Sequence, residues 1–148
     1  MISRILIATA AIAMLGFAAY GFWQSRPAPP PPPADDAISE TEDGWMVAVR
    51  VPELSGRAAL GEVAFNAKCA VCHGENAAGQ NGVAPPLIHR IYEPAHHGEN
   101  AFLRAVMNGV ISHHWSFGNM PPVEGLTPGD IKNIVAYIRA LQKENGIF

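Results

Sequence analysis

The sequence predicts an all-α domain, and three features of its 148 residues lead to that prediction. Three segments space their apolar residues as amphipathic helices do, and runs typical of strands are scarce. The segments between the helices, residues 74–98 and 110–126, are irregular, and such long loops are uncommon in a small domain unless something else organises them. Three short helices also have little core of their own. A large buried cofactor would account for both features.

The N-terminal segment predicts a membrane anchor. Residues 5–23 carry no charged side chain, and 19 apolar residues are about enough to cross the core of a bilayer. The run is longer than the apolar part of a signal peptide, and it ends in an aromatic cluster typical of a membrane interface. We therefore expect residues 1–26 to be an uncleaved anchor. The alternative is a cleaved signal, with residues 19–21, Ala-Tyr-Gly, as the best cleavage site.

The composition of residues 27–43 predicts a tether between the anchor and the compact domain. Six prolines between positions 27 and 33 favour an extended polyproline II conformation, and five acidic residues follow without a base among them. The rest of the chain, residues 44–148, is expected to be the compact domain. It holds eight acidic residues and eight lysines or arginines, so it is formally neutral. No basic run indicates nucleic-acid binding.

Two elements are expected at the start of the compact domain. Residues 44–54 alternate apolar and other residues, and they predict an extended arm that lies on the domain, with Met46 outside the core. A first helix is expected over residues 55–68, with Ser55 as its N-cap. The residues whose spacing indicates this helix are Leu60, Val63, Ala64 and Ala67.

Two further helices are expected after the long loops. Residues 100–108 predict a helix that ends at Gly109, with Met107 among its packing residues. Residues 128–143 predict the last helix, because Thr127 and Asp130 form a capping box and Pro128 stands at the first helical position. The apolar stripe of this helix consists of Ile131, Ile134, Val135, Ile138 and Leu141.

The two cysteines, Cys69 and Cys72, are followed at once by His73. A structural zinc site would need a second cluster of ligands, and the chain has no second cysteine pair. A redox dithiol favours a βαβ context, which this all-helical pattern lacks, and a plain disulfide is a third alternative. Cys-x-x-Cys-His is also the attachment motif of c-type haem. The export segment and the core-poor loops favour haem, with His73 as one axial ligand of its iron.

Met120 is the candidate for the second axial position. Pro121 and Pro122 restrict the backbone at and after it, and a thioether in a stiff loop suits an iron ligand. The alternative is that Met120 only fills a gap in the core. His113 and His114 are rival ligands.

Residues from about 54 to 142 resemble a class I c-type cytochrome with one haem. The matching segments, in the order of that family, are "LGEVAFNAKCAVCHG", "APPL", "NGV", "NMPP" and "LTPGDIKNIVAYIRALQ". The resemblance implies a small cytochrome c fold, in which helices and long loops wrap around one covalent haem c. It also implies that Cys69 and Cys72 form thioethers to the haem and that His73 and Met120 bind the iron.

The resemblance assigns two further roles. The carbonyl of Pro85 would bind the other ring nitrogen of His73 and so fix the ring. Gly61 and Phe65 would lie where the first helix crosses the last one, near Tyr137, and the glycine would allow close approach.

The segment "ISHHWSFG" departs from the general pattern of the family. His113, His114 or Trp115 would contact a haem propionate, or the histidines would face solvent while Trp115 packs. His89, His96 and His97 are expected at the surface.

These assignments predict an electron carrier and not an enzyme, because both axial positions of the iron are filled. We expect it in the inner membrane of a bacterium, with its haem domain in the periplasm, or as a soluble periplasmic protein if the signal is cleaved. It would carry electrons from a quinol-oxidising complex to a terminal oxidase or photosynthetic reaction centre. The alternatives are a haem c subunit of a larger membrane oxidoreductase and a gas-binding or peroxidatic cytochrome.

Overall fold

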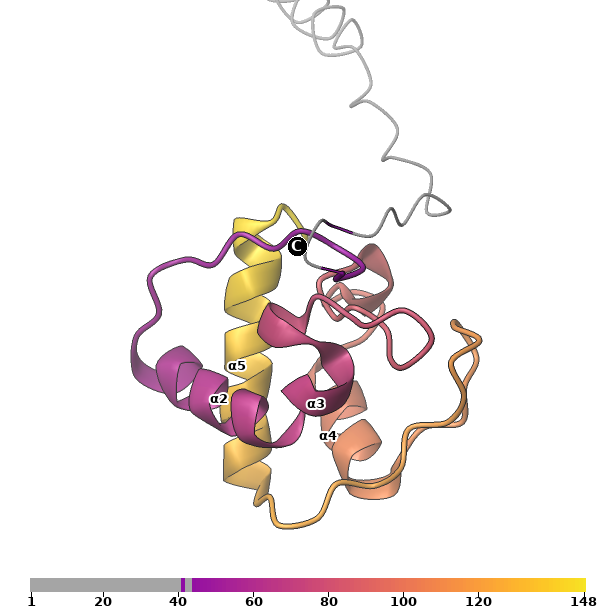
Figure 1. Ribbon diagram of the computed structural model, residues 1–148. Coiled ribbons are helices and arrows are strands. Elements are labelled where there is room, and N and C mark those ends of the chain that lie inside the picture. Colours follow the sequence, from indigo (N-terminus) through magenta and orange to yellow (C-terminus); the bar gives the residue numbers. More distant parts are fainter. Residues whose placement is uncertain (1–40, 42–43) are drawn as a thin grey trace, which may run out of the picture. The chain divides into compact units, whose positions relative to one another are not determined.

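The computed structural model describes residue 41 and residues 44–148 (Figure 1). The predicted anchor, and the predicted tether apart from residue 41, lie outside the described residues. In the described part the elements follow the order α2 (Gly56–Lys68), α3 (Ala70–His73), η1 (Glu75–Ala77), η2 (Arg90–Tyr92), α4 (Glu99–Asn108) and α5 (Pro128–Glu144). None of the helices in this part is long and apolar enough to cross a membrane. Helices and loops without a sheet confirm the all-α prediction.

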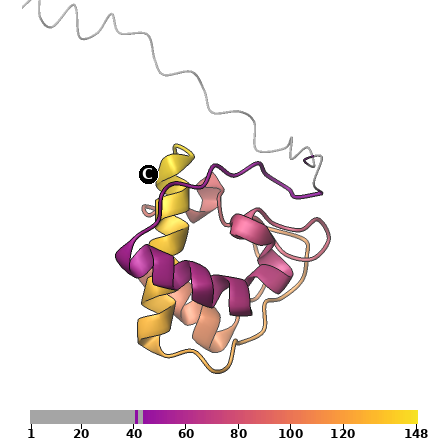
Figure 2. The same ribbon diagram turned by 60° about the vertical axis from the view of Figure 1, so that its left-hand side comes forward.

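Helices α2 and α5 cross at close range and form the centre of the fold (Figure 2). The rings of Phe65 and Tyr137 are fully buried there, with their centroids 5.4 Å apart. A Cβ on Gly61 would lie 1.9 Å from the carbonyl oxygen of Asn133, so only glycine fits at the crossing. Gly61, Phe65 and Tyr137 thus occupy the crossing that the resemblance implied.

Helix α5 provides most of the buried side chains. Its start has the expected capping box: Thr127 accepts from the backbone of Asp130, and the Asp130 carboxylate accepts from the backbone of Thr127. The expected stripe is buried along its whole length, and Tyr137 and Gln142 are buried with it. Buried Gln142 donates to the carbonyl oxygens of Leu87 and Tyr92 and so ties the first long loop to the helix.

The packing residues predicted for α2 and α4 are partly wrong. Leu60 and Val63 are 61% and 69% exposed, because the close crossing at Gly61 turns the face with Gly61 and Phe65 toward α5. Met107 is 55% exposed, whereas its neighbour Val106 is buried against α5. The period of these helices was correct, but tertiary contacts decided which face is inside.

The segment before α2 is an extended arm, as expected, but its inner face includes Met46, which is only 4% exposed. The placement of Met46 outside the core was therefore wrong. Its backbone N–H donates to Gly79 and that of Val47 donates to Ala78, so the first long loop fixes the orientation of the arm. Further along, Arg50 exchanges backbone hydrogen bonds with the side chain of Asn145.

Candidate cofactor site

One cavity of about 750 Å³ lies between the helices and the two long loops. Its lining is mostly apolar and includes buried residues of α4 and α5 such as Val106, Ile131 and Ile138. All the site residues predicted from the sequence also line it: Cys69, Cys72, His73, Pro85 and Met120. Residues separated by as many as 51 positions are therefore brought to one apolar space.

The Cys-x-x-Cys-His segment forms a single helical turn after α2. The backbone N–H groups of Cys72 and His73 both donate to the carbonyl oxygen of Cys69, at 3.1 and 2.9 Å. Residues three and four apart in a helix lie on the same side, so this spacing directs both thiols and the imidazole toward one region. Both cysteines are free thiols, and the pKa of Cys69 is raised to about 11, first by burial and then by Cys72.

His73 is held in a defined orientation. Its Nδ1 lies 2.9 Å from the carbonyl oxygen of Pro85, the contact that the resemblance implied. A carbonyl can only accept, so Nδ1 carries the proton and Nε2 keeps a lone pair. Burial lowers the pKa of His73, and the hydrogen bond to Pro85 opposes this effect. A neutral, oriented imidazole of this kind is suited to bind a metal ion.

Met120 is held by a backbone pair that the sequence did not reveal. Its N–H and C=O groups exchange hydrogen bonds of 3.0 and 2.9 Å with Val110, in an antiparallel bridge. Gly109, just before Val110, has a φ of +77°, and a Cβ there would lie 2.6 Å from the carbonyl oxygen of Met120. The half-buried Met120 packs against the cluster of Val106, Ile131 and Val135. Its thioether is thus held on the cavity side of the loop.

A family model, Cytochrome c, matches residues 58–142 of the chain, which is more than half of its length. The chain belongs to the cytochrome c family. Its function is therefore electron transfer by a bound haem c. A search of curated proteins found no match.

The turn that carries Cys69, Cys72 and His73 in this cytochrome has a support that sequence reasoning missed. The side-chain nitrogen Nε2 of Gln80 donates toward the carbonyl oxygens of Ala70, Val71 and Cys72, at 3.3, 3.0 and 3.1 Å. These are carbonyls at the end of a short helix, which need partners outside the helix. A glutamine in an irregular loop carries no local signal of such a role, because its partners are eight to ten residues away.

The apolar lining of the cavity fits haem, and the polar groups of the cavity fit it too. Among the described residues, the buried indole Nε1 of Trp115 makes no hydrogen bond of ordinary geometry, although it lies near enough to the side chain of Tyr92 to oppose the rise in the pKa of Tyr92 that burial causes. Trp115 lines the cavity, and its ring packs against His89 and Phe117. A haem carboxylate is an acceptor that such a donor could bind. An apolar cavity with two thiols, an imidazole, a thioether and a buried indole donor therefore fits this cofactor.

The remaining histidines are not evenly spread over the surface. His96 is exposed, as expected, but His97 is half-buried. Both line the mouth of the cavity together with exposed His113 and His114. His89 is half-buried against Trp115 and accepts from the backbone of Ile91, so the prediction of a surface residue holds only in part.

Proposed function

We propose that this cytochrome is an electron carrier with one haem c, bound covalently through Cys69 and Cys72, with His73 and Met120 as axial ligands. The observation that carries the proposal is that all four side chains line one apolar cavity of about 750 Å³. The haem supplies a one-electron iron couple, and histidine–methionine ligation favours a raised potential. The protein supplies the fixed positions of the ligands.

Each ligand side chain has its own backbone support. The carbonyl of Pro85 fixes the ring of His73, and the bridge to Val110 fixes the backbone of Met120. The apolar side chains around the cavity exclude water from the iron. A rigid, dry environment limits the rearrangement that accompanies a change of charge, and this favours fast electron transfer.

The same ligand set favours a carrier over an enzyme. With one nitrogen and one sulfur ligand from the chain, the iron keeps no open position for a substrate or a gas. Electrons would pass through the exposed edge of the site, where Cys72 is exposed and the loop around Met120 reaches the surface.

We also propose that the carrier is anchored by one span in the inner membrane of a bacterium, with its haem domain in the periplasm. The apolar run, the proline-rich segment and the formally neutral domain support this proposal. Tethering raises the effective concentration of the domain near membrane partners, and so replaces the long-range attraction of a charged docking surface. Its partners would be a quinol-oxidising complex and a terminal oxidase or photosynthetic reaction centre.

A second candidate is a haem c subunit of a larger membrane oxidoreductase. Purification in mild detergent separates the two, because a subunit would copurify with partners in fixed stoichiometry and a carrier would not.

Replacement of Met120 by alanine tests the ligand set. We expect Met120→Ala to lower the reduction potential and to let the reduced protein bind carbon monoxide, because the sixth position of the iron is then open. The measurements are a redox titration and the absorption spectrum under carbon monoxide.

Met107→Ala is the matched control, because Met107 lies exposed on α4. We expect this variant to keep the potential and to exclude carbon monoxide. If Met120→Ala behaves like Met107→Ala, Met120 is not the ligand.

A further inference from the structure

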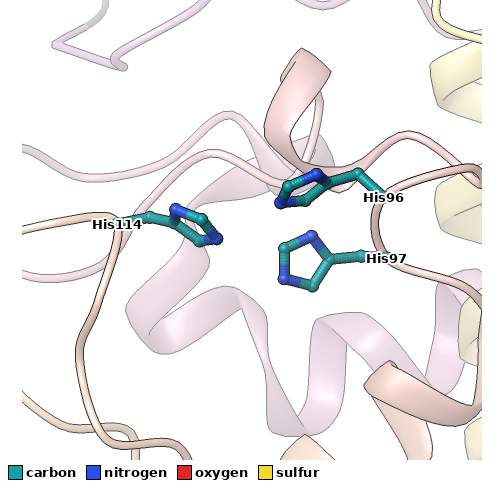
Figure 3. Close-up of side chains that lie close together, drawn as sticks. All are labelled: His96, His97 and His114. Atoms are coloured by element: carbon teal, nitrogen blue, oxygen red, sulfur yellow. The ribbon is translucent and has the colours of Figure 1, made fainter.

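Three histidines from two different loops lie close together (Figure 3), and all three line the cavity. His96 and His97 precede α4, and His114 belongs to the loop between α4 and α5. One ring nitrogen of each lies within 4.8 Å of the corresponding atoms of the other two. The ring centroid of His114 is 5.4 Å from that of His96 and 5.3 Å from that of His97.

His97 has the fixed geometry of a metal ligand. Its Nδ1 is 2.5 Å from the carbonyl oxygen of Ile91, so Nδ1 donates there and Nε2 keeps its lone pair. Its own backbone carbonyl accepts from the guanidinium of Arg139 on α5. A hydrogen bond from the second ring nitrogen to a backbone carbonyl is the usual support of a metal-bound histidine.

The two other rings have the freedom that a binding site needs. His96 and His114 are exposed, so both rings can turn without disturbing the core. Desolvation, followed by the nearby histidines, lowers the pKa of His114, which favours the neutral form that can bind a metal. A fourth imidazole, His113, has its ring centroid 4.3 Å from that of His114.

We propose that His96, His97 and His114 bind one divalent transition-metal ion of the zinc class, with water as the fourth ligand. Imidazole nitrogens suit zinc, copper and nickel, whereas magnesium and calcium prefer oxygen ligands. A tetrahedral zinc ion with Zn–N bonds of about 2.0–2.1 Å needs ligand nitrogens about 3.4 Å apart. The ligand nitrogens lie within 4.8 Å of one another, so they must approach by up to about 1.4 Å to bind the ion. Rotation of the exposed rings of His96 and His114 provides this movement.

This site is separate from the proposed iron ligands, which are His73 and Met120. It goes beyond electron transfer, because no part of the proposed carrier function requires a second metal ion. Zinc binding by a Met120→Ala variant should be unchanged, so a failure of the proposed ligand set and a failure of this proposal can be told apart.

Calorimetric titration of the full-length holoprotein with Zn²⁺ in a buffer that does not chelate the ion tests the proposal. We expect one ion to bind per chain. His114→Gln should weaken binding by more than about tenfold, because even the loss of a hydrogen-bond partner of a metal ligand costs 10- to 100-fold in affinity. His96→Gln also replaces an exposed ring and should weaken zinc binding to the same extent. This second variant keeps the proposal testable if His114→Gln fails to fold.

His89→Gln is the matched control, because it removes a histidine of the same loop that is not in the cluster. The haem absorption spectrum of each variant verifies that its haem site is intact. The proposal is overturned if the unchanged protein binds no stoichiometric zinc, if His114→Gln and His96→Gln keep full affinity, or if His89→Gln loses as much affinity as they do.

Discussion

At the scale of single residues, the site depends on backbone contacts as much as on the ligand side chains. The sequence predicted Cys69, Cys72 and His73 as site residues from their spacing, and the structure places them on one helical turn that lines the cavity. It predicted Met120 because the prolines after it restrict its backbone, and Met120 lines the same cavity. Their roles as haem and iron ligands stay predictions. The supports from Val110 and Gln80 could not be predicted, since a hydrogen bond from a residue of an irregular loop leaves no periodic pattern in the sequence.

The support of Met120 can be tested at Gly109. We expect Gly109→Ala to displace the backbone of Met120, because the new Cβ would lie 2.6 Å from its carbonyl oxygen. A larger fraction of the reduced protein should then bind carbon monoxide, as measured by absorption spectroscopy.

Gly118→Ala provides the comparison within the same loop. Gly118 also has a positive φ, +95°, but a Cβ added there would meet no other atom within 4 Å. Both variants place an L residue at a positive φ, which is disfavoured, and only Gly109→Ala adds the clash. Equal carbon monoxide binding in the two variants would contradict the role given to Gly109.

At the scale of elements, the predicted helices differ in how well their inner faces were assigned. The stripe of α5 was correct, because a capping box fixed its start and the helix is buried over most of its length. In α2 the helical spacing of the apolar residues was predicted correctly, but the face that packs inside was not. The position of α2 is set by contact with the backbone of α5 at Gly61, and a glycine adds nothing to an apolar pattern.

The crossing itself leads to a stability prediction. Gly61→Ala should lower the free energy of unfolding by about 1–3 kcal/mol, because a Cβ 1.9 Å from the carbonyl oxygen of Asn133 forces α2 and α5 apart. Denaturant titration of the holoprotein measures the change.

Gly129→Ala in the first turn of α5 serves as its control. There a Cβ would meet the hydroxyl of Thr127 at an ordinary 3.5 Å, and alanine is the better helix former by about 1 kcal/mol. This variant should be as stable as the unchanged protein or more so. A Gly61→Ala variant of undiminished stability would mean that the crossing tolerates a wider separation.

At the scale of the whole molecule, the sequence predicted the helical cytochrome c domain, but not the histidine cluster. His97 and His114 are 17 residues apart on separate irregular loops. The sequence predicted a surface position for His97 and left His114 between a contact with the haem and a position facing solvent. Their proximity follows from how the loops are tied to the helices, for instance through Arg139, and such ties are visible only in three dimensions.

The anchor proposal is also a prediction about the whole molecule. After fractionation of the native host, haem staining should detect the protein in the membrane fraction, where it should resist washing with high salt and dissolve in detergent. Detergent is required because an apolar span of 19 residues is held by the bilayer core and not by charge. A soluble mature protein whose N-terminus lies beyond residue 19 would contradict the anchor.

The bridge between Val110 and Met120 has a consequence for how this protein can evolve. It closes the loop at its base, so the nine residues between the two partners can be substituted, and even change in number, without moving the methionine. His113 and His114 lie in that interval. Mutation can therefore add or remove imidazoles at the rim while Met120, the proposed iron ligand, is conserved, and the two properties can be selected independently of each other.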